Sequence, residues 1–180
     1  MNIPSLETPR LILRGFSPAD FKPLCAILSD REVLRYMPRT DPYPPESVQR
    51  IIDCQQLHWD MHGFGWYAVE DRLSAELVGW CGLGVLDETN ETEIKYLLKR
   101  SHWGRGLATE AALPCLAGGF TRYGLQAIIG LVHPHNAASR RVLEKLGLTY
   151  QDRVHYWGMD LDRLALIKTG YLERTSESIS

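Results

Sequence analysis

The stretch EIKYLLKRSHWGRGLATEA, residues Glu93 to Ala111, changes character in its middle. A short apolar-rich run typical of a strand leads into a loop and then into a helix-forming segment that begins near Leu107. Gly104 and Gly106 lie in front of this helix and have no β-carbon, so a ligand can approach the main chain closely there. A helix N-terminus also presents unpaired N–H groups and a partial positive charge. The stretch therefore predicts a site for a phosphate-bearing ligand at the start of the helix.

The other residues of this stretch fit that interpretation. Arg105 can add a charge-assisted contact to a phosphate, Ala108 keeps the first turn slim, and Thr109 adds a hydroxyl. The stretch is not a Walker loop, because no Gly-Lys-Ser/Thr follows the glycines, and it is not G-x-G-x-x-G, because position 109 is Thr. Taken alone, it is equally consistent with a tight glycine turn beside a solvated Arg105.

The segments around this stretch predict one α/β domain. Helical spacing and caps indicate helices over residues 17–30, 46–63, 106–124 and 136–147, with Pro114 and the Gly118-Gly119 pair expected to kink or shorten the third. Strand-like runs cover residues 10–16, 65–71, 76–86, 92–98, 125–132, 148–157 and 163–171. Antiparallel strands that lead into a β-α-β unit predict a mixed, mostly antiparallel sheet flanked by helices. We expect a single domain over residues 1–180, with a core at about 7–171 and a short C-terminal tail.

Composition narrows the class of protein. The 180 residues carry a formal net charge of −2 and contain no cluster of five or more basic residues, which argues against a nucleic-acid partner. The four cysteines lie far apart without C-x-x-C spacing, so we expect reduced thiols and no metal site. The sequence has neither the apolar core of a signal peptide nor a run of about 20 apolar residues, so we expect no membrane association and a cytoplasmic location.

A second motif, HPHNAASRRVLEKLGL, spans residues His133 to Leu148. Asn136 is a natural N-cap, and Ser139 follows one turn later on the same side of the helix. An amide and a hydroxyl at this spacing can bind one extended polar ligand along the helix start. Ordinary helix capping by Asn136 explains the same residues.

Together the two motifs resemble the GNAT superfamily of N-acetyltransferases, whose pattern is Arg/Gln-x-x-Gly-x-Gly/Ala followed by an Asn-x-x-Ser helix. Here the first motif is WGRGLA, Trp103 to Ala108, and the second runs from Asn136 to Gly147. The resemblance implies that acetyl-CoA is the acetyl donor, that the strand ending at Leu98 pairs with its pantetheine arm, and that Asn136 binds this arm from the other side. The pyrophosphate would be held by the main-chain amides of Gly104, Arg105, Gly106, Leu107, Ala108 and Thr109.

The opening of the chain adds to the resemblance, and two positions depart from the pattern. ETPRLILRGFSPADFKPLCAILSDREVLRYM, residues 7–37, is similar to the start of the branch that includes ribosomal-protein N-terminal acetyltransferases. Trp103 stands where the family usually has Arg or Gln. Lys95 stands where a glycine is common, which implies an altered acceptor pocket.

Acetyl transfer to an amine needs a neutral nucleophile, support for the tetrahedral oxyanion and a proton for the leaving thiolate. The resemblance suggests the backbone N–H near Tyr96 for the oxyanion. Glu93 is our first candidate for the base, although a Glu93–Lys95 ion pair on one strand face is also consistent with the spacing. Ser139 is the candidate acid. Tyr150 and His133 are reserves, and Glu110 is expected to be solvated.

We therefore expect an acetyl-CoA-dependent N-acetyltransferase that acts on a primary amine, with a protein or peptide N-terminus as the first choice. The alternatives are an acetyltransferase for a small-molecule amine, such as a polyamine, an amino acid or a drug, and a non-catalytic module that binds acyl-CoA. The sequence is consistent with a monomer or a homodimer.

Overall fold

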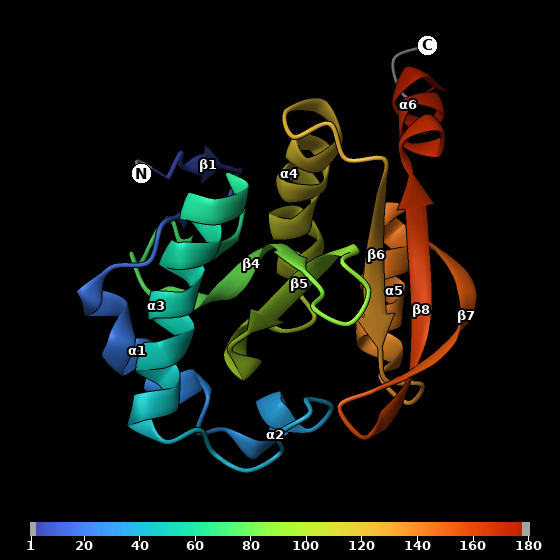
Figure 1. The fold of residues 1–180 in the computed structure, drawn as a ribbon. Coiled ribbons are helices and arrows are strands. Elements are labelled where there is room, and N and C mark those ends of the chain that lie inside the picture. The colour runs from blue at the N-terminus through green and yellow to red at the C-terminus, as the bar shows by residue number, and fades with distance from the viewer. Residues whose placement is uncertain (1–2, 178–180) are drawn as a thin grey trace.

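The computed structural model describes residues 3–177, so residues 1, 2 and 178–180 of the expected single domain lie outside the described part. Within that part, eight strands form one sheet in the order β1-β2-β3-β4-β5-β6-β8-β7 (Figure 1). β5 and β6 are parallel, and every other neighbouring pair is antiparallel. The predicted α/β fold with a mixed, mostly antiparallel sheet is confirmed. The strands are β1 Leu6–Glu7, β2 Leu11–Arg14, β3 Trp66–Asp71, β4 Leu77–Val85, β5 Thr92–Leu98, β6 Ala127–Val132, β7 Thr149–Tyr156 and β8 Met159–Ile167.

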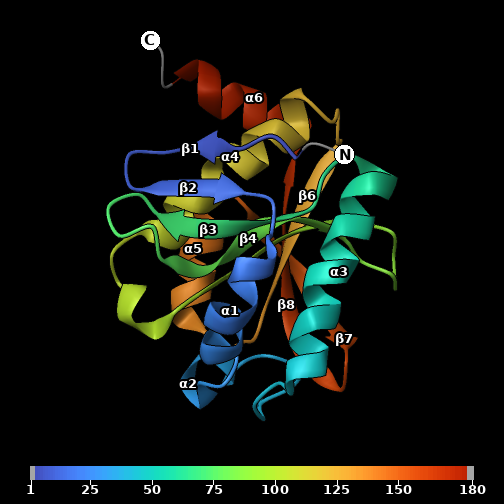
Figure 2. The ribbon, with the colours of Figure 1, turned by 90° about the vertical axis from the view of Figure 1, so that its left-hand side faces the viewer.

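Helices cover both faces of the sheet. The α-helices are α1 Phe21–Ile27, α2 Arg31–Leu34, α3 Pro45–His62, α4 Leu107–Thr121, α5 Ala137–Leu146 and α6 Lys168–Glu177, and two short 3-10 helices are η1 Pro18–Asp20 and η2 Arg100–His102. Figure 2 shows α1 and α3 in front of the sheet and α4 and α5 behind it. Buried side chains of α1 and Val48 of α3 pack with Trp80 and Leu97, whereas those of α4 and α5 pack with Ile94 and Leu98. Alternation along β5 therefore sends neighbouring side chains to opposite helix layers.

Two predicted helix ends are confirmed, and the helix that contains Pro114 is not interrupted at the proline. Gly63 and Gly147 end α3 and α5 with φ of 74° and 96°, a left-handed conformation that glycine adopts at little cost. The third predicted helix, α4, continues past Pro114 to Thr121 without shortening. Proline removes one helical hydrogen bond, but the neighbouring turns of α4 are buried against the sheet, and that packing offsets the loss.

The C-terminal end of the sheet also differs from the prediction. The strand expected over residues 163–171 ends at Ile167, and the chain continues as the helix α6. Ile167 pairs with Ala127, the first residue of β6. The residues after Ile167 therefore have no residue of β6 with which to pair. Instead the ring of Tyr171 stacks on Phe120 of α4 at 4.8 Å. None of the helices in the described part is both long and apolar enough to span a membrane.

Candidate active site

β5 and β6 lie side by side at one end and separate toward the other. Their parallel register, over the described residues, is a single pair, Glu93 with Ile129. Beyond it, β5 stays paired with β4 as far as Leu98, and β6 stays paired with β8 as far as Val132. The two strands therefore diverge and leave a gap in the middle of the sheet.

Main-chain groups of β5 line this gap. The N–H of Lys99 donates to the carbonyl of Val78 at 2.7 Å, which fixes the hydrogen-bonding phase of the β4–β5 ladder. Because bonded and non-bonded pairs alternate, the N–H and C=O groups of Tyr96 and Leu98 point away from β4 and into the gap. The Leu98 carbonyl accepts a hydrogen bond from the indole N–H of Trp103 at 2.7 Å. Trp103, the unusual residue of the first motif, thus ties the loop to the end of β5.

The loop before α4 is an open cradle of main-chain N–H groups. Gly104 and Gly106 have φ of 71° and 77°, the left-handed conformation that favours glycine. Within the described structure, the N–H groups of residues 104–109 donate to no protein acceptor. A β-carbon at Gly104 would meet nothing within 4 Å, and one at Gly106 would meet only Arg10, at 3.8 Å. Unpaired donors, open space and a helix N-terminus together suit a bound diphosphate.

Arg10, which sequence analysis missed, braces this cradle. Its Nη1 donates to the carbonyl of Arg105 at 3.0 Å, and its Nε donates to Glu110 at 2.7 Å. Glu110 also accepts from the hydroxyl of Thr8 at 2.7 Å, and its side chain is only 14% exposed, so the expectation that it is solvated is wrong. Burial raises the pKa of Glu110, but the hydrogen bonds from Thr8 and Arg10 outweigh it, and the pKa is lowered. No sequence pattern marks Arg10, because its partners lie about 100 residues away.

The structure brings Ser139 and Tyr96 together. The Tyr96 hydroxyl lies 2.8 Å from the Ser139 hydroxyl and 3.0 Å from the Ser139 carbonyl, which links α5 to β5 beside the gap. Asn136 caps α5, because its side-chain oxygen accepts from the N–H of Ser139 at 3.1 Å. Burial raises the pKa of Tyr96 above its ordinary value, so the phenol stays protonated at neutral pH.

Glu93 and Lys95 form an ion pair on the other face of β5. Lys95 Nζ lies 3.0 Å from Glu93 Oε2, where the side chains are 27% and 7% exposed. Oε2 is buried and takes no well-aligned hydrogen bond from the described residues. Burial raises the pKa of Glu93, while the Lys95 charge and the N–H of Leu131 oppose that shift only in part. A buried carboxylate with a raised pKa beside the strand gap is suited to accept a proton.

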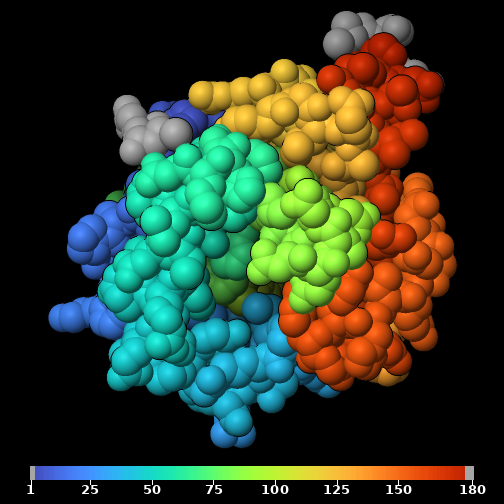
Figure 3. Space-filling view, in the orientation of Figure 1, coloured from blue at the N-terminus to red at the C-terminus, as the bar shows by residue number. Residues whose placement is uncertain are grey.

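A cleft lies on the α3 side of the sheet, the side on which Lys95 is partly exposed (Figure 3). Figure 3 shows a hollow between α3, the loop that follows β4, the β7–β8 turn and the segment before α3, with the central strands at its floor. Lys95 Nζ lies 5.7 Å from the ring centre of Trp66 and 5.3 Å from that of Trp157. Trp157 has a φ of 54° at the β7–β8 turn, an uncommon conformation for a bulky side chain. Sequence analysis missed both tryptophans, because their common neighbour is apparent only from the folded strands.

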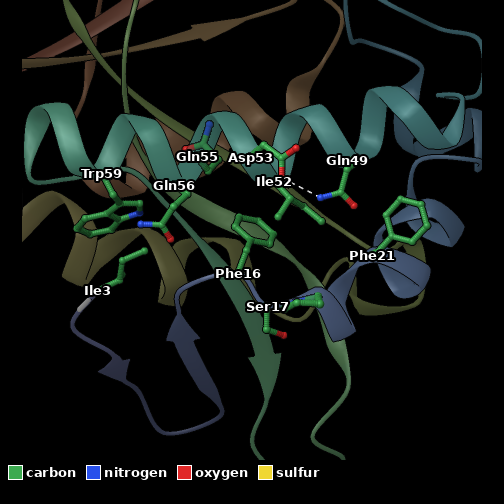
Figure 4. Close-up of a pocket in the computed structure, with 11 residues that line it drawn as sticks. Ile3, Phe16, Ser17, Phe21, Gln49, Ile52, Asp53, Gln55, Gln56 and Trp59 are labelled. Atoms are coloured by element: carbon green, nitrogen blue, oxygen red, sulfur yellow. Dashed lines mark hydrogen bonds between the residues drawn. The ribbon is translucent and has the colours of Figure 1, made fainter. Parts of the chain in front are cut away.

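The remaining candidates lie elsewhere. Tyr150 is 53% exposed on β7, one of the two edge strands. His133 follows β6 and packs against the ring of Tyr36 at 5.1 Å. A cavity of about 280 Å³ lies between α3 and the N-terminal segment, and Figure 4 shows two of its polar lining residues, Gln49 and Asp53, hydrogen-bonded to each other. The cavity contains none of the predicted site residues.

Comparison with known proteins agrees with this geometry. Residues 10–149 match the acetyltransferase (GNAT) domain family. The "Uncharacterized N-acetyltransferase p20" of Bacillus licheniformis is 35% identical over 146 residues, which cover 79% of this chain and 80% of that protein. The "Uncharacterized N-acetyltransferase YoaA" of Bacillus subtilis (strain 168) is 34% identical over 149 residues, covering 80% of this chain and 82% of that protein.

Solved structures show the same fold. An acetyltransferase from Agrobacterium tumefaciens str. C58 superimposes with a TM-score of 0.81 at 26% identity, covering 92% of this chain and 95% of that one. A putative GNAT-family acetyltransferase from Bordetella pertussis gives a TM-score of 0.79 at 26% identity, covering 90% and 98%. The chain therefore belongs to the GNAT family and is an acetyl-CoA-dependent N-acetyltransferase.

Proposed function

We propose that this enzyme acetylates a primary α-amine, with the N-terminus of a protein or peptide as the first choice and a small-molecule amine as the second. The observation that carries the proposal is the buried carboxylate of Glu93, which lies at the point where β5 and β6 separate. A base in this position meets an acceptor that approaches from the α3 side of the sheet. The amide of Tyr96 points into the same gap.

The proposed donor site uses main-chain groups. The N–H groups of residues 104–109 would bind the pyrophosphate of acetyl-CoA, and the charge of Arg105 would add to their attraction. The main chain near Leu98 and the amide side chain of Asn136 would hold the pantetheine arm. The Leu98 carbonyl already accepts a hydrogen bond from the indole N–H of Trp103. The N–H of Leu98 is therefore the group that stays available to the pantetheine arm.

The proposed roles of the side chains follow from their surroundings. Glu93 would accept the proton of the acceptor ammonium, the N–H of Tyr96 would stabilise the oxyanion, and Ser139, hydrogen-bonded to the Tyr96 hydroxyl, would supply a proton to the leaving thiolate. At pH 7 roughly 10% of an α-amine is neutral, against about 0.04% of a lysine side chain, so the free energy needed to deprotonate the lysine is larger by about 3.5 kcal/mol. An α-amine therefore needs less help from the enzyme, and a single carboxylate suffices as its base.

Named structural neighbours do not decide the acceptor. The ribosomal-protein-S5-alanine acetyltransferase from Vibrio fischeri gives a TM-score of 0.77 at 18% identity, and the spermidine N-acetyltransferase from Vibrio cholerae gives 0.73 at 20%. At such identities the likeness supports the fold alone, and the two names stand for different kinds of acceptor. The choice therefore depends on the residues of this chain.

Incubation with acetyl-CoA and a mixture of peptides and small amines tests the proposal. We expect thiol release, and a mass increase of one acetyl group on the α-amines, with peptides modified first. Modification of polyamines alone would contradict the choice of acceptor. Tight binding of acetyl-CoA without thiol release for any amine would instead support the non-catalytic module.

A further inference from the structure

Three polar groups lie together on the floor of the cleft. Register places Trp66 of β3, Gly82 of β4 and Lys95 of β5 in one row across the sheet, and it places Gly84 beside Glu93 in the next. A β-carbon at Gly84 would lie 3.1 Å from the indole nitrogen of Trp66. The indole therefore extends over Gly84 toward Glu93, which brings an N–H donor, a carboxylate and an ammonium to one site.

One of these groups lacks a partner. The indole N–H of Trp66 is buried and forms no hydrogen bond with the described residues, whereas the buried Oε2 atom of Glu93 is paired with Lys95 Nζ at 3.0 Å. Trp66 is held firmly, because its main-chain N–H donates to Gln55 at 3.0 Å and its carbonyl accepts from Trp59 at 3.1 Å. A buried polar group without a partner is costly, so an unpaired N–H donor close to the ammonium of Lys95 indicates a ligand that brings an anionic acceptor such as a carboxylate.

The charges around the cleft are divided. Lys95 contributes a positive charge at the floor. Asp87 and Glu88 lie in the loop between β4 and β5, on the side where Glu93 sits. A polycation that enters this cleft meets Lys95, whereas a molecule with one ammonium and one carboxylate meets a complementary charge at each end.

We propose that the acceptor carries a carboxylate within a few bonds of its primary amine, and that Lys95 and the indole N–H of Trp66 bind this carboxylate while Glu93 binds the amine. This inference rests on the proposed function and narrows its acceptor. Two sources share the chemistry, namely a free α-amino acid and a peptide whose first residue is acidic. Lys95 exchanges its bond with Glu93 for one with the acceptor carboxylate, so the charge of Lys95 stays paired and Oε2 is released toward the ammonium.

The test compares matched acceptors with wild-type enzyme. Peptides that begin with Asp and with Asn but are otherwise identical form one pair, and phenylalanine and its amide form another. We expect kcat/KM to be at least about tenfold higher for the carboxylate member of one pair, and spermidine to be the poorest acceptor. The pair that shows the preference identifies the source. Equal rates within both pairs, or a preference for spermidine, would overturn the inference.

Variants assign the preference to individual groups. Lys95→Met keeps most of the side-chain volume, and we expect it to abolish the preference and to raise the rate with spermidine relative to the carboxylate acceptors. Lys95→Arg keeps the charge and should keep the preference. Trp66→Phe removes the N–H but keeps a ring, and we expect a higher KM for the carboxylate acceptors. A preference that survives Lys95→Met would show that Lys95 is not its source and would overturn the assignment.

Binding of the same amines to the protein loaded with CoA, followed by tryptophan fluorescence, separates the two possible failures. Carboxylate-dependent binding without acetyl transfer would overturn the proposed function and support the recognition site. Acetyl transfer combined with binding that ignores the carboxylate would overturn the recognition site and leave the proposed function in place.

Discussion

Gly106 shows how much one residue without a side chain can contribute to a site. Its φ of 77° strains any other residue by about 1 kcal/mol, while a β-carbon there has room beside Arg10. We expect Gly106→Ala to weaken acetyl-CoA binding only modestly. Gly106→Glu adds a negative charge beside the phosphates, and we expect it to weaken binding by at least a further tenfold, about 1.4 kcal/mol. Calorimetry with both variants separates strain from charge, and equal affinities for the two would count against a phosphate site.

Glu93 is the residue whose replacement tests the proposed base. Glu93→Gln keeps the shape but cannot accept a proton, so we expect kcat/KM to fall about a hundredfold at pH 6.5, where the acceptor is protonated. The loss should shrink above pH 8, where the α-amine is already neutral. A pH–rate profile measures this difference, and an equal loss at every pH would indicate a positioning role.

The stability of the same variant provides the control. Burial raises the pKa of Glu93, so this carboxyl stabilises the fold most below its unfolded pKa of about 4.3, and the contribution is lost as pH rises through the folded pKa. We therefore expect Glu93→Gln to be at least as stable as the wild type to urea at pH 7. A large destabilisation would make its kinetics uninformative, and Glu93→Asp would then replace it.

Several site residues could be predicted from the sequence because their signals are local. The two glycines lie directly before α4, and Asn136 and Ser139 lie three residues apart at the start of α5, so each signal is contained within one helix start, where the structure places it. Arg10 and Trp66 could not be found in this way. Their roles depend on partners in distant segments, and a lone Arg or Trp has no distinctive pattern.

At the scale of elements, the start of α4 depends on its hydrogen bonds with Thr8 and Arg10 in the turn between β1 and β2. Glu110→Gln keeps one acceptor oxygen for Thr8 and the main-chain N–H of Arg10, but it loses the second oxygen and the charge that pair with the Arg10 guanidinium, and we expect a loss of about 1 kcal/mol in the free energy of unfolding at pH 7. Because the pKa of Glu110 is lowered, its contribution is present above about pH 4.3 and is lost as pH falls through the folded pKa. The difference between wild type and variant in urea unfolding should therefore narrow below pH 4.

The predicted helices and strands differ from the structure mainly where tertiary contacts, and not the local sequence, determine the secondary structure. The pattern over residues 163–171 is apolar enough for a strand, yet the sheet ends at Ile167 and the chain turns into α6. Pro114 predicts a kinked or shortened helix, yet α4 is not interrupted at the proline, because its neighbouring turns are packed against the sheet. Where capping residues and alternation agreed with the tertiary structure, as in α3, α5 and β3 to β5, the predicted elements are confirmed within a few residues.

For the whole molecule, the donor should act as a stabilising ligand. A ligand at one hundred times its Kd stabilises the folded state by about 2.7 kcal/mol, which corresponds to a rise in Tm of roughly 5 to 10 °C for a domain of this size. We expect this shift with acetyl-CoA and only a small one with the Gly106→Glu variant. Differential scanning fluorimetry measures it, and a similar shift with adenine nucleotides that lack the pantetheine arm would show that the arm contributes little.

The gap between β5 and β6 joins two surfaces that are otherwise separated by the sheet. The cradle before α4 and the Tyr96–Ser139 pair belong to one side, while Trp66, Lys95 and the β7–β8 turn belong to the other. The turn around Trp157 can therefore become longer or differently charged during evolution, and the enzyme can then accept a different amine. The residues that bind the coenzyme need not change. Directed evolution of new acceptor preferences should begin at that turn.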